Sequence, residues 1–313
     1  MKKENYVNSS GKIIDSENRS KPKVSIIVGI TPRKGFDSIF NLLKTILAQK
    51  GDIDFECIIV DVVHEQRRKI YRENFPWVKL IQTDTFLYEP ALQNIGVKQA
   101  RGEFIVFLED HVLLSPYYLK NLVAIISHGY SIIGGPVANG NPGVFTGWLQ
   151  YFTEYHKWMP GLTDGEIGDL PGSNCVYHAE VLKTLGSFPE AEFGVATHFL
   201  KKAKDAGYKL CLCSGLEVEH INDRKIWIIW VERFKYGHLF AARRGFSLWK
   251  RILYVIFSPV IALLEYIRIF HHALRSPLYL KKFVQCTPLL LPTLFIWMIG
   301  ECLGYLLGMK TEK

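Results

Sequence analysis

The sequence lacks three patterns that would each point to a different class of protein. Its six cysteines are scattered and show neither a disulfide framework nor the paired spacing of a zinc site. No nucleic-acid-binding motif accompanies the formal net charge of +8, and the basic residues cluster between positions 201 and 251, beside hydrophobic segments. We therefore expect anionic lipid or a phosphate-bearing substrate as partner, and no nucleic acid.

The first residues also lack the apolar core of a signal peptide. Residues 1–20 are polar and charged, so we interpret them as a flexible tail. Without a signal for export, the catalytic half is expected to stay in a reducing cytoplasm.

The most informative segment that is present is the apolar run 104–108, which leads directly into Glu109, Asp110 and His111. Near-continuous apolar strands belong to parallel sheets buried on both faces, and ligands bind beyond the carboxyl ends of such strands. Glu109 and His111 lie two residues apart and point the same way in an extended chain, so they suit a divalent cation such as Mn²⁺. A solvated turn at the strand end is the alternative reading of these residues alone.

The surrounding sequence repeats the pattern of strands and helices. Strands are predicted where apolar residues run together, and helices where apolar residues recur at three- and four-residue spacing. The predicted strands are 24–31, 56–60 and 78–81, and the predicted helices are 36–49 and 90–100. These units predict an α/β fold with a mostly parallel sheet flanked by helices.

Residues 21–222 resemble glycosyltransferase family 2, whose nucleotide-sugar-binding domain has the GT-A fold. The resemblance rests on the first strand, on the strand that ends at Asp61, on the stretch from Asn94 to His111, and on the loop 171–174. It implies an enzyme that transfers a sugar from a nucleotide-sugar donor. The residues it implies in donor binding are Thr31, Asp61, Asn94, Glu109, Asp110 and Asn174.

The sequence departs from the family pattern at two places in the donor site. Val62 stands where many members carry a second acid after Asp61, and the usual acid-x-acid motif is Glu109-Asp110-His111. Polypeptide N-acetylgalactosaminyltransferases resemble this variant, because an acid-x-His motif and a later histidine complete their metal site. By that resemblance Glu109, His111 and His220 would hold Mn²⁺ or Mg²⁺, which offsets the diphosphate charge of the leaving nucleotide.

The catalytic base is less clearly marked. Inverting members of the family place an acidic pair at the start of the acceptor-side helix, but residues 195–196 are Val and Ala. Glu192 and His198 are the nearest candidates, the first because a carboxylate is the family's base and the second because imidazole titrates near neutrality.

The last part of the chain, 223–313, has a different character. A basic amphipathic segment is followed by an apolar stretch at 252–264, broken by Pro259, and by the uncharged run 283–300. Three arrangements stay open: a hairpin that crosses the membrane, a re-entrant or interfacial pair, and a buried helical core or oligomer interface. The connection between the two stretches contains Arg275, Lys281 and Lys282. A crossing hairpin would place these residues outside the cell, whereas Lys and Arg are enriched in cytoplasmic loops.

Two functions of different classes follow. The first is a metal-dependent, inverting glycosyltransferase that acts at the cytoplasmic face of the membrane, near its anionic leaflet, on a lipid-linked saccharide or surface polysaccharide. The second is a non-catalytic membrane scaffold that binds nucleotide-sugar or a partner synthase. The aromatic stretch 148–159 has helical spacing and is read either as core packing or as a surface on which sugars stack.

Overall fold

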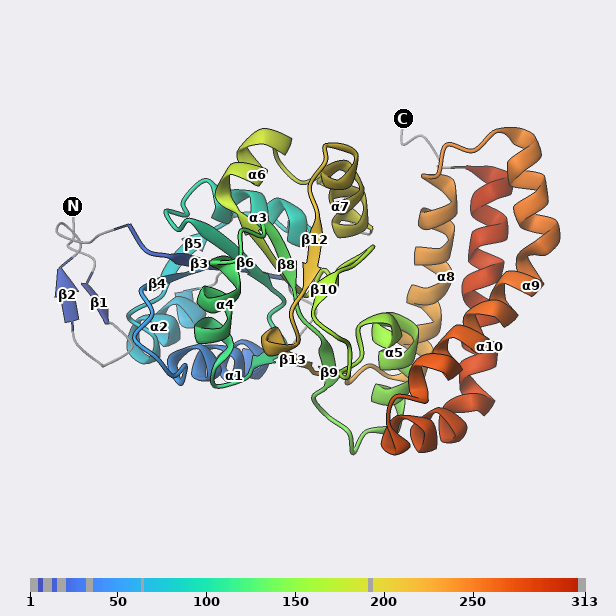
Figure 1. Ribbon diagram of the computed structural model, residues 1–313, viewed down its shortest axis with the longest axis horizontal. Coiled ribbons are helices and arrows are strands. Elements are labelled where there is room, and N and C mark those ends of the chain that lie inside the picture. The colour runs from blue at the N-terminus through green and yellow to red at the C-terminus, as the bar shows by residue number, and fades with distance from the viewer. Residues whose placement is uncertain are drawn as a thin grey trace. The chain divides into compact units, whose positions relative to one another are not determined.

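The computed structural model describes residues 5–7, 13–15, 21–31, 36–62, 65–190 and 194–308. The chain divides into two compact units. The first comprises Met1–Ala138 and Pro160–His220, and the second comprises Asn139–Met159 and Ile221–Lys313 (Figure 1). The sequence predicts a boundary after residue 222, close to where the second unit resumes, but it does not predict that residues 139–159 belong with the C-terminal helices.

The core of the first unit is an eight-stranded sheet in the described part of the chain, with the order β10-β12-β8-β11-β6-β3-β4-β5. Four neighbouring strands on one side are parallel, and their apolar side chains are largely buried. These are β3 (Val24–Ile30), β4 (Phe55–Asp61), β5 (Lys79–Gln82) and β6 (Phe104–Leu108). The predicted strands at 24–31, 56–60, 78–81 and 104–108 are confirmed.

The remaining strands of this sheet follow in a mixed arrangement. Strand β11 (Asn174–His178) runs antiparallel to both β6 and β8 (Ile132–Gly134). Strand β12 (Leu210–Leu212) is parallel to β8, and β10 (Gly165–Glu166) is antiparallel to β12. Near the amino terminus, β1 (Asn5–Val7) and β2 (Ile13–Asp15) pair antiparallel with each other, within the predicted tail.

Helices accompany the strands of this unit, as the α/β prediction requires. Close packing is clearest where α3 meets β3, because a Cβ on Gly96 of α3 would overlap the side chain of Ile27. The helices are α1 (Phe36–Leu47), α2 (Glu65–Asn74), α3 (Glu89–Val97), α4 (Tyr118–Ile126), α6 (Ala179–Leu185), α7 (Val195–Asp205) and the 3-10 turn η3 (Ser214–Leu216).

A second, three-stranded sheet has the order β7-β13-β9. Its strands are β7 (Val112–Leu114), β13 (Val218–His220) and β9 (Val137–Asn139). Strand β7 follows β6 almost directly, so this small sheet brings the end of β13 to the end of the central strand.

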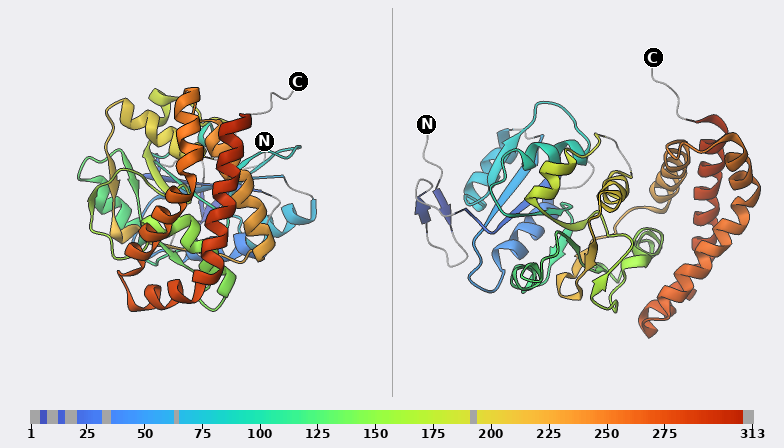
Figure 2. Two further views of the ribbon diagram at one scale, coloured as in Figure 1. Left: turned by 90° about the vertical axis from the view of Figure 1, so that its right-hand side faces the viewer. Right: turned by 45° about the horizontal axis from the view of Figure 1, so that its top comes forward.

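The second unit is helical. It contains α5 (Phe145–Tyr155), the 3-10 turn η2 (His156–Trp158), α8 (Ile226–Ala242), α9 (Leu248–Ala273) and α10 (Pro277–Leu307). Helix α10 packs against both α8 and α9 and lies between them (Figures 1 and 2). The backbones of α8 and α10 approach closely, since a Cβ on Gly300 would meet the carbonyl oxygen of Phe234 and one on Gly304 that of His238.

The predicted break at Pro259 is wrong. Helix α9 is continuous over 26 residues with Pro259 inside it, and α10 likewise contains Pro288 and Pro292. An interior proline removes one backbone hydrogen bond and bends a helix, but tertiary packing can retain the helix. By length and composition alone, α9 and α10 could each cross a membrane, with mean hydropathies of 1.9 and 1.7.

The aromatic residues of α5 belong to the core of this unit. Trp148, Tyr151 and Phe152 are almost fully buried. The ring centroid of Trp148 lies 6.0 Å from that of Tyr279, and the centroid of Phe152 lies 5.9 Å from that of Phe283. Of the two readings of this stretch, core packing is the one that the structure supports.

Candidate functional site

The centre of the candidate site is the carboxyl end of β6. This strand is buried along its whole length, with β3 parallel on one side and β11 antiparallel on the other. The chain leaves the sheet at Glu109, whose side chain is 24% exposed, and continues through Asp110 and His111 into β7. The buried strand thus fixes the backbone that carries these three side chains.

The small sheet brings a third side chain to the same place. In the antiparallel register of β7 and β13, His220 lies opposite Val112, the residue after His111. His111 Nε2 lies 3.1 Å from Glu109 Oε2, and His220 Nε2 lies 3.2 Å from the same oxygen. The imidazole centroids are 4.3 Å apart, and both rings are almost fully buried. Residues distant in sequence therefore meet around one carboxylate.

These donor atoms fit a divalent metal. One carboxylate oxygen and two imidazole nitrogens all lie within 4.8 Å of one another, and the separations of 3.1 and 3.2 Å are those of adjacent ligands on one ion. Such a mixed oxygen and nitrogen set suits Mn²⁺ and also accepts Mg²⁺ or Zn²⁺. The predicted ligands Glu109, His111 and His220 are thus brought together.

Asp110 takes a position that the sequence does not predict. Its buried carboxylate oxygen Oδ1 lies 2.7 Å from His111 Nδ1. A carboxylate at Nδ1 fixes the tautomer of an imidazole and leaves Nε2 free to bind a metal. The contact of Asp110 with the donor stays a prediction, and the structure adds a contact with His111.

The electrostatics of Glu109 agree with a cation site. Burial of its carboxyl acts to raise the pKa, but hydrogen bonds with His111 and His220, and the charges of those imidazoles, lower the pKa well below its ordinary value. The carboxylate is consequently held in its ionised form, which is the form that binds a metal.

Thr31 and Asp61 lie at the same edge of the sheet. Asp61 ends β4 and pairs in register with Ile30 of β3, the residue before Thr31. Val28, also in β3, pairs with Leu108 at the end of β6. Asp61 is 1% exposed, and the hydroxyl of Tyr71 lies 3.3 Å from its Oδ2. The carboxyl ends of three adjacent parallel strands therefore carry Thr31, Asp61 and Glu109.

The two predicted asparagines have partners within the protein. The amide of Asn94 donates to the carbonyl oxygen of Phe188 at 2.9 Å and accepts from the amide nitrogen of Phe188 at 2.9 Å. The fully buried amide of Asn174 accepts from the Tyr118 hydroxyl at 2.7 Å and donates to the carbonyl oxygen of Leu216 at 2.7 Å. Each amide has a second N–H and a second oxygen lone pair beyond these bonds, so the donor contacts of Asn94 and Asn174 stay predictions.

Sequence reasoning missed Ser173. Its side chain is 1% exposed, and its Oγ is a buried atom with no hydrogen-bond partner in the described structure. Ser173 precedes Asn174, which pairs with Leu108, so its backbone lies beside the position of Glu109. Buried hydroxyls without hydrogen-bond partners are rare, so this hydroxyl marks Ser173 as a candidate ligand contact. The sequence pattern alone does not reveal it.

Of the two candidates for the catalytic base, the structure describes only His198. His198 is exposed in the first turn of α7, where its backbone amide donates to the carbonyl oxygen of Gly194. Glu192 lies outside the described residues. Val195, where the family pattern expects an acid, is buried at the start of the same helix.

Comparison with known proteins gives the family. The sequence model of "Glycosyl transferase family 2" matches residues 25–186, just over half of the 313 residues. The chain belongs to glycosyltransferase family 2. The matched range includes Glu109, Asp110 and His111 and ends before α7 and β13, so His198 and His220 lie beyond it.

A curated relative of this family 2 chain is the O-antigen biosynthesis protein RfbC of Myxococcus xanthus. It is 35% identical over 112 residues, which are 34% of this chain and 8% of the relative. The chain thus spans a small part of that protein's length.

Two solved structures are similar in fold. A mannosyltransferase of Pyrobaculum calidifontis, in complex with GDP-Man and Mn²⁺, is 16% identical with a TM-score of 0.54, over 91% of this chain and 86% of the other. GalNAc-T7 with UDP, GalNAc and Mn²⁺ is 14% identical with a TM-score of 0.54, over 76% of this chain and 53% of the other. The predicted GT-A fold is confirmed.

Proposed function

We propose that this glycosyltransferase moves a sugar from a nucleotide-sugar donor to a membrane-associated acceptor, with inversion at the anomeric carbon, and that it depends on a divalent metal. The acceptor class is a lipid-linked saccharide or a growing surface polysaccharide, and the place of reaction is the cytoplasmic face of the membrane.

The observation that carries this proposal is the convergence of Glu109, His111 and His220 on one another, with Asp110 behind His111. Such a metal would offset the charge that develops on the diphosphate leaving group. Both similar structures were solved with a nucleotide or nucleotide-sugar and Mn²⁺, which supports the same ligand classes here.

The nucleoside half of the donor is proposed to lie over the ends of β3 and β4. Asp61 supplies a carboxylate that accepts hydrogen bonds from a ribose or a base, and Thr31 lies beside it at the same sheet edge. Ser173 is proposed as a further donor contact, because its buried hydroxyl has no partner among the described residues.

The proton of the attacking acceptor hydroxyl needs a base. Glu192 and His198 remain the two proposed bases, separated by the start of α7. An exposed imidazole can accept a proton near neutral pH, whereas a carboxylate follows the usual chemistry of the inverting family members.

The membrane-associated acceptor is supported by two independent facts. Helices α9 and α10 are long and apolar, and the relative from Myxococcus xanthus bears the name of an O-antigen biosynthesis protein. A lipid-linked acceptor would be reached most readily by an enzyme that is itself held at the membrane.

Calorimetric titration of the detergent-purified protein with GDP and UDP, with and without Mn²⁺, tests the proposal. We expect one of these nucleoside diphosphates to bind only when the metal is present, and we expect His111→Ala to lose this binding. His128→Ala is the matched control, because His128 is exposed on the same unit and its Nδ1 lies 3.2 Å from the carbonyl oxygen of Ala124, in its own helix region. Absence of nucleotide binding under every metal condition would contradict the proposal.

A further inference from the structure

Helix α9 exposes a long apolar face. Its exposed large apolar side chains recur at three- and four-residue intervals, which places them on one side of the helix. They are Leu248, Trp249, Leu253, Ile256, Phe257, Val260, Leu263, Leu264 and Ile267. A contiguous apolar surface of this length on a helix marks an interaction site.

The uncharged part of this face is short. It runs between Arg251 and Glu265, over residues 252–264. At a rise of about 1.5 Å per residue this stretch is roughly 20 Å long, and the hydrocarbon core of a bilayer is about 30 Å thick. The face is therefore long enough to enter one leaflet, and too short to cross the bilayer without burying charge.

The turn between α9 and α10 is held by residues 145–158. His156 Nε2 lies 2.9 Å from Glu265 Oε1, and His156 Nδ1 lies 2.9 Å from His272 Nδ1. Phe152 of α5 packs against Phe283 at the start of α10. These contacts attach the carboxyl end of α9 and the first turns of α10 to α5 and η2.

The covalent path of the chain fixes the side on which this turn lies. The segment Asn139–Met159 leaves the first unit after Ala138 and returns to it at Pro160. Its α-helix α5 has eleven residues and spans about 16 Å, which is too short to cross a bilayer once, let alone twice. The segment must stay on the side of the catalytic unit, and so must the turn that it holds.

We infer that α9 and α10 form a monotopic membrane anchor, with the apolar face of α9 in the hydrocarbon of one leaflet and the α9–α10 turn on the catalytic side. This inference rests on the membrane association in the proposed function and resolves its geometry. Basic residues lie at both ends of the apolar face, as an anionic headgroup layer requires. They are Arg243, Arg244, Lys250 and Arg251 at one end, and Arg268, Arg275, Lys281 and Lys282 at the other.

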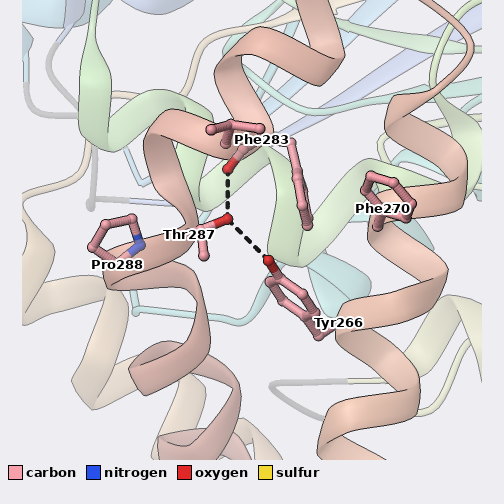
Figure 3. A pocket seen from close by; sticks show the side chains of 6 residues that line it. Tyr266, Phe270, Phe283, Thr287 and Pro288 are labelled. Carbon is pink, nitrogen blue, oxygen red and sulfur yellow. Dashed lines mark hydrogen bonds between the residues drawn. The ribbon is translucent and has the colours of Figure 1, made fainter.

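A groove between α9 and α10 also suits contact with the hydrocarbon of the leaflet (Figure 3). Its cavity of about 480 Å³ is lined by Tyr266, Phe270, Phe283, Val284, Thr287 and Pro288. Thr287 Oγ1 donates to the carbonyl oxygen of Phe283 at 3.0 Å and lies 3.1 Å from the Tyr266 hydroxyl, so the polar atoms of the wall are paired. Hydrocarbon chains of the leaflet can fill this groove without leaving a polar group unsatisfied.

Cysteine labelling tests which side the turn occupies. Leu274→Cys places a thiol in the exposed turn, and Lys183→Cys places one at an exposed position of α6 in the catalytic unit. The native thiols are buried or half-buried, so labelling of the wild-type chain measures the background reaction. A membrane-impermeant maleimide is applied to intact cells and, separately, to inverted vesicles.

We expect both introduced thiols to react in the same preparation and to be protected in the other. Reaction of Leu274→Cys and Lys183→Cys from opposite sides would overturn the inference in favour of a crossing hairpin.

Release from the membrane tests the apolar face. The double variant Ile256→Asp/Val260→Asp should shift most of the chain from the membrane to the soluble fraction. Leu47→Asp, at an exposed apolar position on α1, should not. Recovery of the wild-type chain in the soluble fraction as a dimer, together with protection of the thiol in a Phe257→Cys variant, would overturn the inference in favour of a second copy. Neither readout uses turnover, so an inactive chain would count against the proposed function and leave this inference standing.

Discussion

Two clusters in this protein contain the same residue types and differ in arrangement. In the first unit, Glu109 meets His111 and His220. In the second unit, Glu265 and His272 of α9 meet His156 of η2. Each cluster therefore has one carboxylate and two imidazoles.

The difference lies in where the donor atoms point. His111 and His220 both turn Nε2 toward one Glu109 oxygen, and among the described residues only this set brings three donor atoms within 4.8 Å of one another. His156 instead uses one ring nitrogen on Glu265 and the other on His272, which makes a chain of contacts. Convergence, and not composition, separates a candidate metal centre from a structural link between helices.

The largest expected effect comes from removing a proposed metal ligand. His111→Ala should lower kcat/KM by about 100- to 1000-fold, because the charge on the leaving diphosphate would lose its stabilisation. A transfer assay with the nucleotide-sugar identified by titration measures this loss. Retention of more than half of wild-type kcat/KM would show that His111 holds no metal used in turnover.

The next effect concerns the residue behind that ligand. Asp110→Asn should weaken Mn²⁺ affinity by about 10- to 100-fold, because an amide does not fix the imidazole of His111 as a carboxylate does. Competition with a metal-sensitive dye measures the affinity. An unchanged affinity would remove Asp110 from the proposed site.

Breaking the second cluster should change stability and leave metal binding intact. His156→Ala leaves the partly buried Glu265 without one of its partners and should cost about 1–3 kcal/mol of stability. Thermal unfolding in detergent measures the loss, and His271→Ala on the exposed side of α9 is the matched control. A fall in Mn²⁺ affinity on changing His156 would contradict the distinction between the two clusters.

The smallest expected effect is at Ser173. Ser173→Ala removes one proposed hydrogen bond to the donor and should lower kcat/KM by about 3- to 10-fold. The free energy of unfolding should change by less than about 0.5 kcal/mol, because no internal hydrogen bond is lost. A stability loss without a kinetic effect would assign Ser173 to folding.

The sequence predicted the strands and the end of β6 well, because buried parallel strands are apolar without interruption and the polar residues after them are conspicuous. It paired Glu109 with His111 from their spacing, but His220 came only through the family resemblance, since the register of β7 and β13 is a tertiary fact. Asp110 could not be placed from spacing, because the chain turns after Glu109.

Two kinds of residue have surroundings that the sequence does not show. Asn94 and Asn174 stay predicted donor contacts, but the sequence does not show that both are buried and hydrogen-bonded within the protein. The sequence predicts that Pro259 breaks the apolar stretch 252–264, but α9 continues through this residue. Both outcomes depend on neighbours that are distant in the sequence.

The most direct test of the metal site is Mn²⁺ binding in the presence of a nucleoside diphosphate, followed by electron paramagnetic resonance, for the wild-type chain, His220→Ala and His128→Ala. His220 is the right residue to change, because only the folded sheet brings it beside Glu109. We predict that His220→Ala loses the bound Mn²⁺ signal at concentrations that saturate the other two proteins. Equal Mn²⁺ binding by all three would contradict a metal centre formed by Glu109, His111 and His220.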